Sequence, residues 1–145
     1  MRAVIQRVKE ASVLVDGRIK GIIGQGLLVL VAVHEKDAES AVVKMGDKIV
    51  NLRIFADSQG KMNRSVQESG GALLIVSQFT LYGDVKKGYR PSFITSAKSE
   101  KARLFYDSLV SYLKKLGIPV NTGEFGALME VKLVNDGPVT IIVDV

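Results

Sequence analysis

The stretch Leu27-Leu28-Val29-Leu30-Val31-Ala32-Val33 is the longest unbroken apolar run of the sequence. A run of this kind, without alternating polar residues, is typical of a strand that is buried on both faces of a sheet. A helix needs about 20 apolar residues to cross a bilayer, and this run is far shorter. The run therefore indicates the central strand of a soluble protein, for which we expect neither a membrane span nor a targeting segment.

A β-hairpin is indicated on the N-terminal side of this run. Val13-Leu14-Val15 and residues 19–23 are apolar segments that flank the dipeptide Asp16-Gly17. A type I′ turn favours this dipeptide, because both of its central residues need positive φ. The residues from the start of the chain to Arg7 indicate a further strand, which charged residues interrupt.

Two helices are expected beyond the central strand. The first is capped by Asp37, and the second is capped by Ser99, ends at Gly117 and cannot resume because of Pro119. Both have apolar residues at helical spacing. These are Ala41, Val42, Met45, Ile49 and Leu52 in the first helix, and Ala102, Phe105, Tyr106, Leu109, Leu113 and Leu116 in the second.

The remaining apolar segments indicate strands, and the last two flank the turn Asn135-Asp136-Gly137-Pro138. Runs of strands with two helices between them indicate the α+β class. We predict a single domain over residues 1–145, in which each helix covers one face of a curved, mainly antiparallel, barrel-like sheet. The strands are expected at residues 53–56, 72–76, 128–134 and 139–145.

The composition excludes several kinds of active site. The chain has no cysteine, which rules out disulfides and a thiol nucleophile and is compatible with a cytoplasmic location. The only histidine, His34, has an acidic, loop-like context and is interpreted as exposed, so neither a multi-histidine metal site nor a Ser-His-Asp triad is expected. No phosphate-binding glycine loop or GxSxG elbow is present. We expect catalysis by positioning and backbone donors, without metal or cofactor.

The net charge of +5 has two interpretations. A positive field attracts polyanions, of which nucleic acid is the commonest in cells. The same charge also serves solubility. Charge alone leaves both interpretations open.

The segment Ser77-Gln78-Phe79-Thr80 stands where an apolar strand runs out into a loop. Strand ends favour functional sites, because the scaffold is rigid while the last residues remain accessible. Successive backbone N–H groups, the two hydroxyls and the glutamine amide can converge there on a carbonyl oxygen. Such donors stabilise the oxyanion of acyl transfer by about 3 kcal/mol each. The alternative is a polar strand end that satisfies only its own backbone.

The segment Asn135-Asp136-Gly137-Pro138-Val139-Thr140 combines a turn signal with a proline. The bond before a proline is the one peptide bond for which the cis form is readily accessible. A simple hairpin turn would explain the segment. A tight hairpin, however, has Asn-Gly or Asp-Gly at its centre, and here Asp136-Gly137 is followed at once by Pro138.

Together these segments resemble the two signature motifs of the D-aminoacyl-tRNA deacylases, SQFTL at residues 77–81 and NDGPVT at residues 135–140. The resemblance covers the whole chain, although Tyr82 stands where the family commonly has a small residue. We therefore expect the deacylase fold and a carboxylic ester hydrolase that releases D-amino acids from tRNA. Further matches in the same order are Gln6-Arg7-Val8, Ala11-Ser12-Val13, Gly26-Leu27-Leu28-Val29-Leu30, Arg53-Ile54-Phe55, Gly60-Lys61-Met62-Asn63, Arg90-Pro91-Ser92-Phe93 and Thr122-Gly123.

The resemblance implies a homodimer in which each active site is shared. In the family, the bond matching Gly137-Pro138 is cis, and this segment reaches from one subunit into the pocket of the other. Its aligned carbonyls accept the substrate ammonium, and an L side chain would then collide with the segment. Chirality is thus judged by exclusion, as a proofreading step of translation in the cytoplasm. Because glycine lacks Cβ, the same pocket is expected to accept glycyl-tRNA.

For the catalytic step the resemblance leaves two roles for Thr80. It has been regarded in the family as a nucleophile, but no base is evident here to activate its hydroxyl. We favour an oxyanion hole formed by Ser77, Gln78 and Thr80, while the terminal 2′-hydroxyl of the tRNA helps to activate water.

Other residues match positions that bind substrate in the family. Arg7 matches the arginine that orients the Gly-Pro loop, and Phe79 and Met129 are expected to line the pocket with Gly137 and Pro138. A basic loop is expected to bind the tRNA through its phosphates and by stacking on the terminal adenine. The residues of this loop are Lys86, Lys87, Tyr89 and Arg90.

Three other functions compete with this reading. A non-catalytic RNA-binding module would explain the charge, but not a rigid Gly-Pro turn beside a donor-rich strand end. An esterase or amidase for small molecules would use Thr80 directly and gain little from tRNA. A related editing enzyme that removes L-alanine would need a trans bond at Gly137-Pro138.

Overall fold

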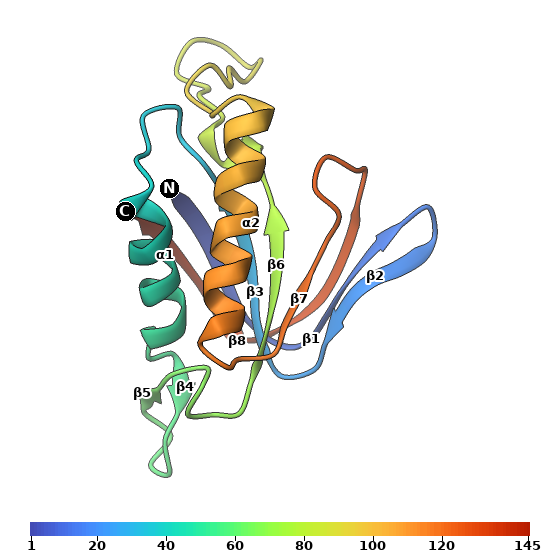
Figure 1. Ribbon diagram of the computed structural model, residues 1–145. Coiled ribbons are helices and arrows are strands. Elements are labelled where there is room, and N and C mark those ends of the chain that lie inside the picture. Colours follow the sequence, from blue (N-terminus) through green and yellow to red (C-terminus); the bar gives the residue numbers. More distant parts are fainter.

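The computed structural model describes residues 1–145, and its main feature is a six-stranded sheet built around the first strand (Figure 1). Strand β1 (Arg2–Val15) pairs antiparallel with β3 (Gly26–Ala32) through its first half and with β2 (Arg18–Ile23) through its second half. Strand β8 (Glu130–Asp144) pairs antiparallel with β1 along nearly its whole length. The same residues of β1 pair with β3 and β8, so β8 occupies the opposite edge.

Two strands extend the sheet beyond β3 in parallel orientation, β6 (Ala72–Ser77) and β7 (Val120–Thr122). Strands β4 (Phe55–Ala56) and β5 (Met62–Arg64) form a separate antiparallel pair. The large sheet is mostly antiparallel and curves toward a closed barrel (Figure 1). The predicted α+β class with a curved, barrel-like sheet and two helices is therefore confirmed.

Strand β3 is buried on both faces, as its apolar run predicts. Leu27 and Val29 belong to the larger core of 23 residues, which includes residues of both helices. Leu28 belongs to a second core of seven residues, to which Leu74 of β6 also contributes. Successive side chains of a strand point to opposite faces, so burial on both sides requires apolar residues without alternation.

Helices α1 (Ser40–Asn51) and α2 (Ser99–Lys115) lie side by side over the same face of the sheet, and not one on each face as expected (Figure 1). Both predicted N-caps are wrong, because the caps are Glu39 and Lys98. Asp37 is engaged elsewhere, since its carboxylate accepts hydrogen bonds from the α-ammonium of Met1 and the N–H of His34.

The predicted hairpin at Asp16-Gly17 is confirmed, with φ angles of 49° and 72° at these residues. The expected pair of C-terminal strands is instead the single strand β8. Gln6 of β1 pairs with Thr140 of β8, and the next paired residues are Val8 and Asn135. Between these two pairs β1 has one residue, whereas β8 has four. Residues 136–139 therefore bulge out of the ladder, which places Gly137-Pro138 on the surface instead of in a hairpin turn.

Candidate active site

The end of β6 is followed by a turn, and the first backbone N–H groups of this turn have no hydrogen-bond acceptor within it. The N–H of Gln78 still bonds to the Val31 carbonyl of β3, at 2.8 Å, and a 3-10 turn η1 (Phe79–Tyr82) follows. The first hydrogen bond of this turn runs from Leu81 N–H to the Gln78 carbonyl. The N–H groups of Phe79 and Thr80 precede that bond, so the turn itself provides no acceptor for them.

The Thr80 hydroxyl is exposed and accepts a hydrogen bond from the Gln78 side-chain amide at 2.5 Å. His34 is half-buried and not exposed as expected, because its ring packs edge-on against Tyr82. Its Nδ1 accepts a hydrogen bond from the Lys36 N–H. The only imidazole of the chain is thus engaged elsewhere, and no base is hydrogen-bonded to Thr80.

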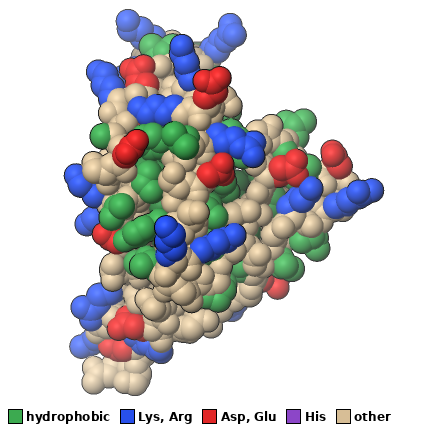
Figure 2. Space-filling view, in the orientation of Figure 1, with side chains coloured by type: hydrophobic (Ala, Val, Ile, Leu, Met, Phe, Trp, Pro, Cys, Tyr) green, Lys and Arg blue, Asp and Glu red, His purple; other side chains and the backbone are tan.

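An apolar cleft of about 590 Å³ opens beside the end of β6. Its walls come from β6 and η1, from the start of α2, and from the loop that leads into β8; the hollow lies between α2 and this loop (Figure 2). Phe79 is 54% exposed and packs edge-on against Phe93. Of the predicted site residues the cleft brings together Ser77, Gln78, Phe79 and Met129.

Several lining residues were not singled out in the sequence. Ala97 lies just before α2, Ser99 and Ala102 lie at its start, and residues 125–128 belong to the loop before β8. Leu128 in this loop is 93% exposed, although it was expected to begin a strand. The only signal for this wall in the sequence was the lack of periodicity in the six residues between Gly123 and β8.

Gly137 and Pro138 are exposed and do not line the cleft of their own chain. Their bond is cis. Arg7 donates from Nε to the Asp136 carbonyl at 2.9 Å, and the same nitrogen lies 3.3 Å from the Asp136 carboxylate. Arg7 also donates to the carbonyl of Ile54. The bulge is therefore held on its inner side by an arginine.

The bulge is also closed by Asn135, the residue that precedes it. The side-chain oxygen of Asn135 accepts the Val139 N–H at 2.8 Å, and its amide donates to the Val139 carbonyl and the Thr140 hydroxyl at 3.2 Å. These contacts and Arg7 leave the Gly137-Pro138 backbone facing outward on a rigid support.

The basic loop connects η1 with α2, both of which contribute to the walls of the cleft, and it projects at the end of the molecule where α2 begins (Figure 1). Tyr89 is fully exposed, and the three cationic side chains of the loop are exposed as well. They are Lys86, Lys87 and Arg90.

No group of three or more histidine, cysteine or acidic residues is arranged to hold a metal ion. None of the helices is long and apolar enough to cross a lipid bilayer.

Comparison with known proteins gives consistent matches. The family model described as D-Tyr-tRNA(Tyr) deacylase matches residues 4–144. D-aminoacyl-tRNA deacylase of Shouchella clausii is 56% identical over 144 residues, which are 99% of each chain. The protein of the same name from Roseiflexus castenholzii is 54% identical over 99% of this chain and 92% of its own.

Two solved structures have the same fold. One is described as c-Myc DNA Unwinding Element Binding Protein, with a TM-score of 0.94, 41% identity and coverage of 100% of this chain and 99% of that chain. The other is a probable eukaryotic D-amino acid tRNA deacylase, with a TM-score of 0.84 and 19% identity over 99% and 98% of the two chains. At that identity, the second likeness concerns the fold alone.

Proposed function

Because the chain belongs to the D-Tyr-tRNA(Tyr) deacylase family, we propose that it hydrolyses the ester of D-aminoacyl-tRNA to free tRNA and D-amino acid, as chiral proofreading in the cytoplasm. The observation that carries this proposal is the donor-rich end of β6 in the wall of an apolar cleft. The proposal is tested by comparing hydrolysis of the D and L forms of one aminoacyl-tRNA, of which only the D form is expected to be lost.

The active site is completed, in this proposal, by a second copy of the chain. One chain carries the cleft and the Gly137-Pro138 segment at separate places, so a single copy cannot bring them together. The segment projects from β8, whose only partner strand is β1 and whose outer edge is free. Leu133, Val134 and Ile142 are exposed on this strand. A two-fold dimer through this region would cover these side chains and complete both sites at once.

Discrimination between D- and L-aminoacyl-tRNA, which we call the chiral gate, results from holding two groups of the substrate in fixed positions. The carbonyls of the partner's bulge accept the ammonium, and the N–H groups at the start of η1 receive the ester carbonyl. With both fixed, the side chain leaves Cα in one direction for a D-residue and in another for an L-residue. The L side chain would collide with the Gly137-Pro138 backbone, whereas glycine has no Cβ and passes. Glycyl-tRNA is therefore a second substrate.

The chemical step needs only water and well-placed donors. The terminal 2′-hydroxyl of the tRNA helps to activate a water that attacks the ester carbonyl. The carbonyl electrons move to the oxygen held by the N–H groups of Phe79 and Thr80, assisted by the side chains of Ser77 and Gln78. When this intermediate collapses, the bond from the carbonyl carbon to the ribose oxygen breaks. That oxygen then takes up the proton that the water has lost.

The tRNA itself is held by the basic loop. Lys86, Lys87 and Arg90 are exposed cations that contact phosphates of the acceptor stem, and Tyr89 stacks on the terminal adenine. This loop lies next to η1, so it can hold the 3′ end over the cleft.

The substitution Thr80→Ala is expected to lower kcat/KM for D-tyrosyl-tRNA by about tenfold at most, the value of one neutral hydrogen bond. The reason is that the donor is the backbone N–H of Thr80, which alanine keeps, while the hydroxyl only accepts a bond from Gln78. Steady-state deacylation of the variant measures the effect, with Thr80→Ser as the matched variant that restores a hydroxyl. A loss of about 10⁴-fold in the alanine variant, with rescue by serine and an acyl group trapped on Thr80, would establish a nucleophile instead.

A further inference from the structure

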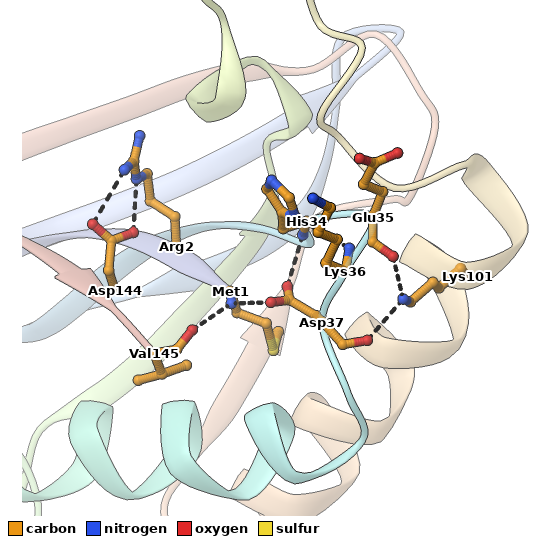
Figure 3. A network of polar contacts seen from close by, with 9 residues as sticks. All are labelled: Met1, Arg2, His34, Glu35, Lys36, Asp37, Lys101, Asp144 and Val145. Carbon is orange, nitrogen blue, oxygen red and sulfur yellow. Dashed lines mark hydrogen bonds and ion pairs between the residues drawn. The ribbon is translucent and has the colours of Figure 1, made fainter.

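A network of polar contacts connects the first residues of β1 with the last residues of β8 and with the segment after β3 (Figure 3). The Met1 ammonium bonds to the Asp37 carboxylate at 2.7 Å and to the Val145 carbonyl at 2.9 Å. Next to it, Arg2 forms a two-pronged ion pair with Asp144, at 2.8 and 3.2 Å. Nothing in the proposed function uses this network, although one of its members contacts η1.

That member is Arg2. Its third nitrogen donates to the Leu81 carbonyl at 3.2 Å, and its guanidinium lies 5.3 Å from the centre of the Tyr82 ring. A single side chain thereby joins β1, the end of β8 and the last two residues of η1. The planar fork of arginine allows this, since it offers several donors in fixed directions.

The Tyr82 ring is also held from another direction. The His34 ring meets it edge-on, with 5.1 Å between the ring centres. His34 is itself held at two points, because its backbone N–H bonds to the Asp37 carboxylate at 2.7 Å and its ring Nδ1 accepts a hydrogen bond from the Lys36 N–H at 3.1 Å. Burial, with smaller contributions from Asp37 and Asp144, raises the pKa of Tyr82 to about 12, so the phenol stays neutral at neutral pH.

Turn η1 depends on such contacts because none of its four residues is buried. The core fixes the position of β6, four of whose residues are buried, but it does not fix the position of η1 in this way. Two backbone hydrogen bonds hold the turn together, from the Leu81 N–H to the Gln78 carbonyl and from the Gly83 N–H to the Thr80 carbonyl. A shift at Leu81 would thus be passed on to the two N–H groups at the start of the turn.

We propose that Arg2 is a positioning residue for the oxyanion-binding turn, which it holds through Leu81 and Tyr82 against the Asp144 end of β8. This inference rests on the proposed function, because it assigns η1 the oxyanion. Arg2 acts through the turn and does not touch the substrate. The Tyr82 ring is contacted by both Arg2 and His34, so it serves as the second point at which the network holds the turn.

The competing role for Arg2 is a phosphate contact, because its side chain is 38% exposed. The two roles differ in what they change. A phosphate contact affects binding, and therefore KM and its dependence on salt. A positioning role affects the chemical step, and therefore kcat.

The test is a comparison of Arg2→Gln, Arg2→Lys and the charge-matched control Arg18→Gln with the wild type, using D-tyrosyl-tRNA. Arg18 is exposed at the start of β2, away from η1. For Arg2→Gln we expect kcat to fall about tenfold with KM within about twofold, since small misplacements of catalytic donors are costly. Arg2→Lys should recover kcat only in part, because an ammonium lacks the planar fork that reaches Asp144 and Leu81 together. The control should keep the wild-type kcat.

An unchanged kcat in Arg2→Gln, with either a salt-dependent rise in KM or only a lower Tm, would overturn the positioning role. Both variants are to be compared well below their Tm, so that a loss of folded protein does not lower kcat. Inertness of the wild type toward D-tyrosyl-tRNA would instead overturn the proposed function, and the two failures are thereby distinguished.

Discussion

The substitution Gly137→Ala is expected to lower kcat/KM for D-tyrosyl-tRNA by about 100-fold or more, the usual cost of displacing a positioning group by roughly 1 Å. Gly137 has φ of +148°, which L side chains rarely adopt. A Cβ there would lie 2.7 Å from both the N and Cγ2 atoms of Val139. Val139 cannot yield easily, because its side chain is buried and its N–H is bonded to Asn135. The bulge must therefore shift, and in the proposed dimer its carbonyls would leave the partner's cleft.

The matched control for this experiment is Gly60→Ala. Gly60 also has positive φ, +78°, but a Cβ there meets nothing within 4 Å. Backbone strain of about 1–3 kcal/mol is then introduced without displacement of the bulge. Deacylation should stay at the wild-type level in the control. If folded Gly137→Ala protein were as active as the wild type, the bulge would have no part in the site.

The substitution Gly26→Ala is expected to have the largest effect on stability, with a loss of about 3 kcal/mol or more. Gly26 pairs with Ala72 at the start of the parallel contact between β3 and β6. A Cβ at Gly26 would lie 1.9 Å from the Ala72 carbonyl oxygen, and a backbone atom inside a sheet cannot move aside. The two strands must separate, and β6 is the strand that ends at Ser77. For a protein of this size we expect Tm to fall by roughly 10 °C.

Thermal unfolding followed by circular dichroism measures this effect, and Gly24→Ala is the matched control two residues away. A Cβ at Gly24 has nothing within 4 Å. The control should unfold within about 2 °C of the wild type, since a surface change of this kind is worth about 0.5 kcal/mol. Equal Tm values for both variants would contradict the close approach of β3 and β6.

The parts of the fold that were predicted are those that depend on local pattern. The apolar run at residues 27–33 indicated a strand buried on both faces, and Asp16-Gly17 indicated the hairpin. Each follows from neighbouring residues through strand periodicity or through the φ values that a turn requires. The end of β6 was placed correctly for the same reason, as an apolar strand followed by polar residues.

The parts that were missed depend on contacts between distant residues. Asp37 is a good cap by type, but the ammonium of Met1 lies against its carboxylate. Strand β7 has only three residues and is ordered by pairing with β6, which no local pattern reveals. His34 is half-buried because Tyr82 comes to it from another element. The split of the proposed site between a cleft and a bulge likewise follows from the pairing of β8 with β1.

The most direct test of the account is deacylation of D-tyrosyl-tRNA, L-tyrosyl-tRNA and glycyl-tRNA by the wild-type protein, with a chelator present throughout. We expect fast loss of the D-tyrosyl and glycyl esters, while the L-tyrosyl ester remains intact. Equal loss of the D and L forms would leave a hydrolase without a chiral gate at Gly137-Pro138. Inertness toward all three would contradict the activity itself and favour an RNA-binding module.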